Sequence, residues 1–157
     1  MRKFLPGLAL LLVLAINTVA EAQAPAYGTP VTLEQAMKIM MAAEAEAKKN
    51  NWPVAIAIVD PSGVLVAFHR LDNTQTGSVN IALEKGRTAA MFKRPSKAFE
   101  DAIAGGRNAV LALGAMPIEG GVPIMLDGKI IGAVGVSGVT SAQDAQVAKA
   151  GADAAGK

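Results

Sequence analysis

The stretch GGVPIMLDGKIIGAVGVSG, residues 120–138, decides the fold. Two apolar runs, 122–126 and 130–136, flank its central Asp127, Gly128 and Lys129. An Asp-Gly pair between runs of this kind predicts a β-hairpin, because tight hairpin turns need residues that tolerate a positive φ. We therefore expect two antiparallel strands joined at this pair.

Glycine recurs through the second of these strands, at positions 132, 135 and 138. Glycine inside a strand weakens it unless another group must come close to the backbone. The favoured interpretation is a helix or a neighbouring subunit packed on the strand. A ligand resting there is the alternative.

The rest of the chain supplies a second hairpin and several helices. The apolar run 54–59, a turn at 60–63 (Asp-Pro-Ser-Gly) and the run 64–69 predict that hairpin. A short strand is expected near 116–119. Helices are expected at 33–49, capped by Thr32 with Gln35, at 78–92, at 97–104, capped by Ser96, and at 142–154, capped by Ser141 with Asp144. Hairpins and apolar runs together predict an antiparallel sheet with helices on both faces.

The N-terminal residues predict export. Arg2 and Lys3 precede the apolar segment 4–16, and small residues follow, which is the build of a signal peptide spanning 1–24. The apolar segment is shorter than the roughly 20 residues that cross a bilayer, so no membrane span is expected after cleavage. A retained N-terminal anchor is the alternative. We expect a linker at 25–30, a domain at 31–157, and a periplasmic or secreted location.

Composition excludes several classes of function. The chain contains no cysteine, which rules out disulfides, thiol catalysis and iron–sulfur clusters. Its formal net charge of +2 would fall to +1 on loss of residues 1–24, and so small a charge gives no field for nucleic acid. Walker, Gly-x-Gly-x-x-Gly and EF-hand patterns are missing from the sequence, which argues against nucleotide and calcium sites.

His69 is the only histidine, so any site based on an imidazole must use it. It ends an expected strand beside Arg70 and opens the polar loop that carries Asp72. A lone histidine cannot build a zinc site that needs two or three such ligands. An ordinary surface or hydrogen-bonded histidine is the alternative to a ligand.

Basic residues gather in the middle of the chain. Six of them fall between positions 85 and 107, namely Lys85, Arg87, Lys93, Arg94, Lys97 and Arg107. A solvated helix face is the plain interpretation. The alternative is an anion site, because guanidinium groups suit carboxylates such as haem propionates.

Four segments in this order resemble the GlcG/HbpS-like family, which includes the C-terminal domain of PduO proteins. They are AIVDPSGVLVAFHRLD at 57–72, ALEKGRTAA at 82–90, IEGGVPI at 118–124 and GAVGVSG at 132–138. The resemblance covers about residues 31–156. It implies a profilin-like three-layer α/β/α fold with a five-stranded antiparallel sheet, homo-oligomers, haem binding and, for some members, sensor partners or haem degradation. One branch has an acidic pair linked to iron, at places where this chain has Asn80 and Leu83.

Together these observations give a hypothesis of an exported haem-binding protein that stores, sequesters or relays haem. His69 would be the axial ligand of the haem iron, and Arg70, Lys85, Arg87 or Arg94 would lie near the propionates. The second class is an enzyme acting on haem or on a small catabolic metabolite, with Asp60, His69 and Asp72 as candidates. The third is a module that contacts a sensor without any cofactor.

Overall fold

The computed structural model describes residues 23–156. Most of the predicted signal peptide, residues 1–22, lies outside the described residues. Among the helices of the described part, none combines the length and hydropathy needed to cross a bilayer.

Four antiparallel strands form one sheet. They are β1 (Ala55–Val59), β2 (Leu65–Arg70), β3 (Gly121–Leu126) and β4 (Lys129–Ser137), in the spatial order β2-β1-β4-β3. The two predicted hairpins are confirmed, and β1 joins them by pairing with β4. At the turn of the second hairpin Asp127 and Gly128 have φ of 49° and 72°, as its sequence requires.

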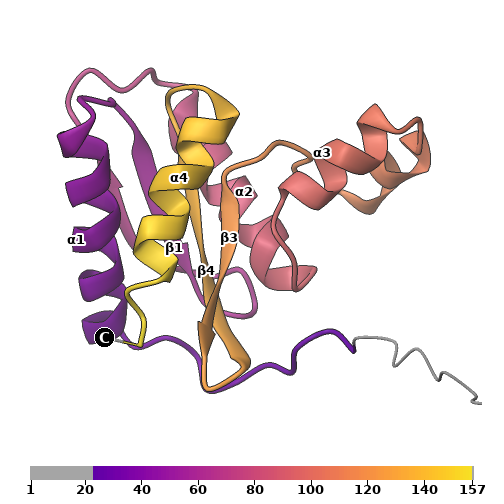
Figure 1. The fold of residues 1–157 in the computed structure, drawn as a ribbon, viewed down its shortest axis with the longest axis horizontal. Coiled ribbons are helices and arrows are strands. Elements are labelled where there is room, and N and C mark those ends of the chain that lie inside the picture. The colour runs from indigo at the N-terminus through magenta and orange to yellow at the C-terminus, as the bar shows by residue number, and fades with distance from the viewer. Residues whose placement is uncertain (1–22, 157) are drawn as a thin grey trace, which may run out of the picture.

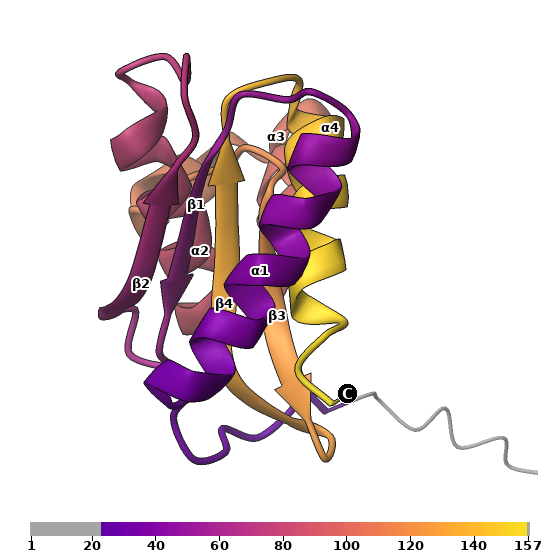
Figure 2. The same ribbon diagram turned by 90° about the vertical axis from the view of Figure 1, so that its left-hand side faces the viewer.

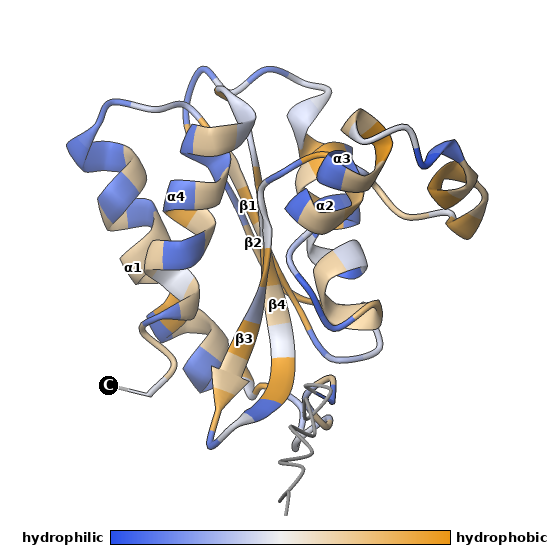
Figure 3. Cartoon of the chain, turned by 45° about the vertical axis from the view of Figure 1, so that its right-hand side comes forward, coloured by the Kyte–Doolittle hydropathy of each residue, from blue (hydrophilic) through white to orange (hydrophobic). Residues whose placement is uncertain are grey.

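Helices cover both faces of this sheet, so the predicted three layers are confirmed (Figures 2 and 3). Helices α1 (Leu33–Lys49) and α4 (Ser141–Ala152) lie on one face, and α2 (Ser78–Met91) lies on the other. The larger core lies beneath α1 and α4 and includes Ile39, Ile56 and Val147. The core beneath α2 is small and rich in alanine.

After α2 the chain leaves the body of the molecule. Helix α3 (Lys97–Ala104) and the 3-10 helix η1 (Asn108–Leu113) form a projection beside the sheet (Figure 1). We call residues 97–113 the arm.

The expected fifth strand is absent from the described sheet, so the prediction of five strands is wrong. The backbone of 116–119 bonds instead to side chains of helices: Met116 N–H donates to Thr88 Oγ1 (2.8 Å), and Glu119 N–H donates to Glu100 Oε2 (2.5 Å). The carbonyl of Ile118 accepts from the Ser96 hydroxyl (2.7 Å). With these groups satisfied, the segment needs no strand partner.

Two predicted helix caps also differ from the structure. Ser96 does not cap α3, because its hydroxyl is engaged by Ile118 and by the N–H of Gly121. Helix α4 is capped one residue earlier than expected, by Thr140 with Gln143 in a capping box. The predicted box of Thr32 and Gln35 on α1 is confirmed.

The residues predicted as a linker lie along the sheet. Tyr27 forms an isolated parallel bridge with Ile130, and its hydroxyl donates to the carbonyls of Ala90 and Met91, at 3.0 Å each. The N-terminal segment thereby fastens the end of α2 to β4. The Lys93 ammonium lies 4.2 Å from the centre of the Tyr27 ring.

The glycines of β4 admit the backbone of neighbouring elements, as the favoured interpretation expected. A Cβ on Gly135 would lie 2.0 Å from the carbonyl oxygen of Ala82 in α2 and 2.4 Å from the backbone nitrogen of Gly86. On β3, a Cβ on Gly121 would lie 2.1 Å from the carbonyl oxygen of Lys85. Helix α2 can therefore rest on the sheet only where side chains are missing.

We predict that Gly135→Ala lowers the free energy of unfolding by about 3 kcal/mol or more, because the new methyl group must displace the backbone of α2. Gly77→Ala is the matched control, since a Cβ there would meet nothing within 4 Å, and it should change stability by less than about 0.5 kcal/mol. Urea unfolding followed by circular dichroism measures both. Equal stability of the Gly135 variant and the wild type would contradict the close contact.

Candidate functional site

His69 lies near the end of β2, on the face of the sheet that α1 covers. Its cross-strand partner in β1 is Ile56, which belongs to the core beneath α1 and α4. The Nδ1 atom of His69 is 2.8 Å from Oε2 of Glu44 in α1. The imidazole is 38% exposed, so this contact is open to solvent on one side.

The Glu44 contact selects the tautomer of the ring. A carboxylate can only accept a hydrogen bond, so Nδ1 of His69 must carry the proton. In neutral His69 the lone pair is then on Nε2. Histidines that bind metals commonly have this arrangement, in which a carboxylate orients the ring through the second nitrogen.

Glu44 is held as an anion. Lys48, one helical turn further along α1, places its ammonium 2.5 Å from Oε1 of Glu44. Hydrogen bonds from Lys48 and then from His69 lower the pKa of the Glu44 carboxyl below its ordinary value of 4.5, although partial burial opposes this. The carboxylate therefore keeps its orienting role at neutral pH.

A surface hollow lies next to this group. Its volume is about 540 Å³, and its lining includes Glu44 and Lys48 from α1, Trp52 after it, and Arg70 and Leu71 at the end of β2. The hollow therefore combines apolar surface with two cations, one of them the predicted site residue Arg70, and with the carboxylates of Glu44 and Asp72. Its size lies in the range of small-molecule sites.

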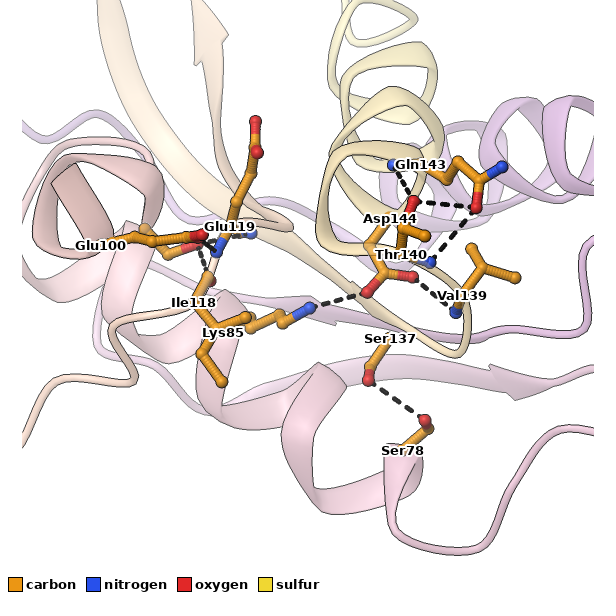
Figure 4. A network of polar contacts seen from close by, with 12 residues as sticks. Ser78, Lys85, Glu100, Ile118, Glu119, Ser137, Val139, Thr140, Gln143 and Asp144 are labelled. Atoms are coloured by element: carbon orange, nitrogen blue, oxygen red, sulfur yellow. Dashed lines mark hydrogen bonds and ion pairs between the residues drawn. The ribbon is translucent and has the colours of Figure 1, made fainter. Parts of the chain in front are cut away.

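Lys85, the third predicted site residue, is buried. Its Nζ is 2.8 Å from Oδ2 of Asp144 at the start of α4, and each of the two side chains is 2% exposed. Figure 4 shows the lysine reaching from α2 toward α4. Burial raises the pKa of the Asp144 carboxyl, and the Lys85 ammonium partly opposes this rise. The pair joins two helices from opposite faces of the sheet.

Arg87 and Arg94 have separate neighbours. Arg87 donates from Nε to the carbonyl of Gly63 and pairs with Glu84 at 2.7 Å. Arg94 donates to the carbonyl of Phe92 and lies over the ring of Phe99.

The structure does not bring the predicted site residues into one cluster. Arg70 follows His69 in β2 but pairs across the strands with Ala55, on the α2 face, whereas His69 pairs with Ile56 on the α1 face. Their roles toward a ligand stay predictions.

The three residues predicted as candidates for an enzyme site do not form one cluster in the structure either. Asp60 lies at the turn end of the first hairpin, where its Oδ1 accepts from the N–H groups of Ser62 (2.8 Å) and Val64 (3.0 Å). His69 lies toward the opposite end of that hairpin. Asp72 lines the hollow beside Glu44. Among the described residues no group of three or more His, Cys, Asp or Glu could hold a metal ion.

Two features escaped the sequence analysis. Glu44 looked like an ordinary helix-surface residue, and no local pattern connects it with a histidine 25 positions away. A larger hollow of about 850 Å³ follows the outer side of β3, with apolar lining that includes Val122, Met125 and Ile130. Met125 and Ile130 both belong to the predicted hairpin. The exposure of Met125 follows from the position of β3 at the edge of the sheet, and the sequence does not give the strand order.

Glu44→Gln should make folding stability less sensitive to acid. Because the folded-state pKa of Glu44 is lowered, its ionised form stabilises the fold above pH 4.5, and this contribution is lost as the pH falls through the folded-state value. The stability difference between wild type and variant should thus be present at pH 7 and vanish in acid. Urea unfolding at a series of pH values measures this difference, and a pH-independent difference would contradict the carboxylate contact.

Comparison with known proteins agrees with this architecture. The family described as "Haem degrading protein HbpS-like" matches residues 31–153. Protein GlcG of Escherichia coli strain K12 is 48% identical over 112 residues, which cover 69% of this chain and 84% of that protein.

Solved structures show the same fold. The crystal structure of HbpS has a TM-score of 0.74 and 30% identity, covering 80% of this chain and 90% of that one. Protein ORFY of Klebsiella pneumoniae has a TM-score of 0.74 and 28% identity, covering 82% of this chain and 92% of that one. From its sequence and its fold, this chain belongs to the HbpS-like family.

Proposed function

We propose that this chain is an exported haem-binding protein, periplasmic or secreted, that stores, sequesters or relays haem. Membership of a family described as haem-degrading supports a haem-related role. The observation that carries the proposal is the contact between His69 and Glu44, which leaves Nε2 of the only histidine free to bind a metal. A homo-oligomer and a sensor partner belong to the same proposal, from the resemblance.

His69 and the hollow beside Glu44 offer groups that suit haem; the imidazole is not part of the lining of the hollow and is linked to it through Glu44. Nε2 would supply the axial ligand, and Glu44 would hold the ring in orientation. Arg70 and Lys48 offer cations for two propionates, and Trp52 and Leu71 offer apolar surface to the porphyrin. Bound haem would supply an iron centre whose absorption reports its ligands.

Arg70 is the first choice among the predicted cations, because it lines the hollow beside Glu44. Lys85 would have to leave Asp144 to reach a propionate, and its departure would leave a buried carboxylate without its cation. Arg87 and Arg94 stay in the proposal as secondary candidates. Lys48 is added because its side chain is exposed and lines the hollow, although its ammonium also contacts Glu44.

Degradation of haem is the second candidate function, and the description of the family favours it. Storage and degradation differ in the fate of the porphyrin. With hemin and a reductant, storage leaves the Soret band in place, whereas degradation removes the band and releases iron. We propose storage or relay as the principal function.

We predict that hemin added to the purified protein gives a shifted Soret band, and that His69→Ala weakens hemin binding about tenfold or more because the axial ligand is lost. Arg70→Gln should weaken binding less, since only one propionate contact is removed. Absorbance titration measures all three proteins.

Lys38→Gln is the control for loss of a positive charge, because Lys38 is exposed on α1 and pairs with Glu34. It should bind hemin as the wild type does. Identical spectra and affinities for wild type and His69→Ala would remove His69 from the site. Loss of the Soret band with iron release would replace storage with degradation.

A further inference from the structure

The hollow along the outer side of β3, which the haem hypothesis does not use, has the size of a ligand site. Its volume is about 850 Å³, within the range of small-molecule sites. Residues from five parts of the chain line it: β3, the start of β4, helix α4, the link from α2 into α3, and the N-terminal segment. We call this surface the β3 hollow. Its shape is set by the fold as a whole and not by one loop.

Much of the lining is apolar and rigid. Val122 and Met125 of β3 belong to it, together with three prolines from three different segments, Pro25, Pro95 and Pro123. Proline has a fixed φ and no N–H group. The three prolines therefore lose little freedom when a ligand binds, and they offer it no backbone donor. Such a wall suits the apolar body of a ligand.

The outer edge of β3 does not suit an added strand, although β3 lies at the edge of the sheet (Figure 2). The N–H of Gly121 donates to Oγ of Ser96 (2.8 Å), and the carbonyl of Gly121 accepts from the N–H of Ser96 (3.0 Å). Two positions further along, Pro123 has no N–H to donate. A peptide, or β3 of a second copy, would therefore lack ladder bonds over the first half of the strand. A small molecule is the occupant that remains.

Two of the three lysines in the lining are already matched by acids. Lys149 pairs with Asp153 at 2.6 Å. Lys97, at the start of the arm, pairs with Asp101 at 2.6 Å. This hydrogen bond and then the charge of Glu119 raise the pKa of Lys97. Neither ammonium is free for a ligand, and the acids around Lys97 would repel a second anionic group on it.

Lys93, the third lysine, has no acidic partner among residues 23–156. Its ammonium lies 4.2 Å from the centre of the Tyr27 ring. The Tyr27 hydroxyl donates to the carbonyls of Ala90 and Met91. The ring therefore holds the ammonium through its π face and leaves the positive charge uncompensated. The β3 hollow thus offers one available cation beside a largely apolar surface.

We propose that the β3 hollow is a second ligand site, which binds an apolar monocarboxylate of the fatty-acid class. The hydrocarbon chain would lie against Val122, Pro123 and Met125, where its burial drives binding. The carboxylate would accept hydrogen bonds from the Lys93 ammonium. This site is separate from the one proposed at His69, and it does not depend on haem binding.

The test titrates the hemin-free full chain, labelled with ¹⁵N, with decanoate and with decan-1-ol, which has the same chain length but no charge. NMR spectra give the affinity and the place of binding. The wild type should bind decanoate about fivefold or more tightly than decan-1-ol. Lys93→Gln should remove this preference by weakening decanoate alone. Lys49→Gln, which changes an exposed lysine of α1 outside the lining, is the matched control and should bind as the wild type does.

Two signals show where the ligand binds. The amide of Met125 should shift on titration, whereas the indole N–H of Trp52, the only tryptophan, should not, because Trp52 lines the other hollow. Met125→Asp should weaken both ligands about tenfold or more, since it places a charge in the apolar wall. Met125 is 40% exposed on an edge strand, and circular dichroism shows whether this variant is folded.

Three results would overturn the proposal: no saturable binding of decanoate, equal affinity of wild type and Lys93→Gln for decanoate, or shifts at Trp52 without shifts at Met125. The second result can be obtained even if Met125→Asp does not fold, because Lys93→Gln leaves the apolar wall intact. Since hemin is absent from every titration, failure here leaves the His69 hypothesis untouched.

Discussion

The architecture depends on the contact between Gly86 of α2 and Gly135 of β4, where no side chain separates helix from strand. Such a close approach places the next residue back along the helix, Lys85, beside the start of β3, where its side chain can extend past Gly120 to Asp144. The buried ion pair then joins α2 to α4 beside the start of β3. One backbone contact thus sets the spacing of the layers and buries a lysine that only a carboxylate could accompany.

Most of the fold could be predicted from local signals, because turns and helix caps depend on residues a few positions apart. Asp127 and Gly128 made the hairpin, and Thr32 with Gln35 began α1. The prediction failed where a distant partner decided the outcome. Ser96 looks like a cap in sequence, but its hydroxyl bonds to Ile118 and Gly121, more than 20 positions away. The same bonds, with those from Thr88 and Glu100, replaced the expected fifth strand.

In the candidate site, too, the sequence predicted what local residues decide and missed what distant residues decide. His69 could be singled out from the sequence because it is the only histidine, and its neighbour Arg70 lies with it at the end of β2. Glu44 could not be singled out from the sequence, because only the packing of α1 on the sheet brings its carboxylate to the imidazole. The sequence predicts Lys85 as a cation near the propionates, because its partner Asp144 lies 59 positions away and burial leaves no mark in the local sequence. The sequence shows the positive charge of Lys85, but it does not show whether the ammonium can reach a ligand.

We propose that the imidazole of His69, oriented by Glu44, binds the iron of a porphyrin. The most direct measurement is the absorption spectrum of the protein isolated from haem-replete cells, with resonance Raman scattering to identify the ligand of the iron. We expect a Soret band and an iron–imidazole signature in the isolated protein. A folded protein that is colourless, and whose spectrum excess hemin leaves unchanged, would contradict it.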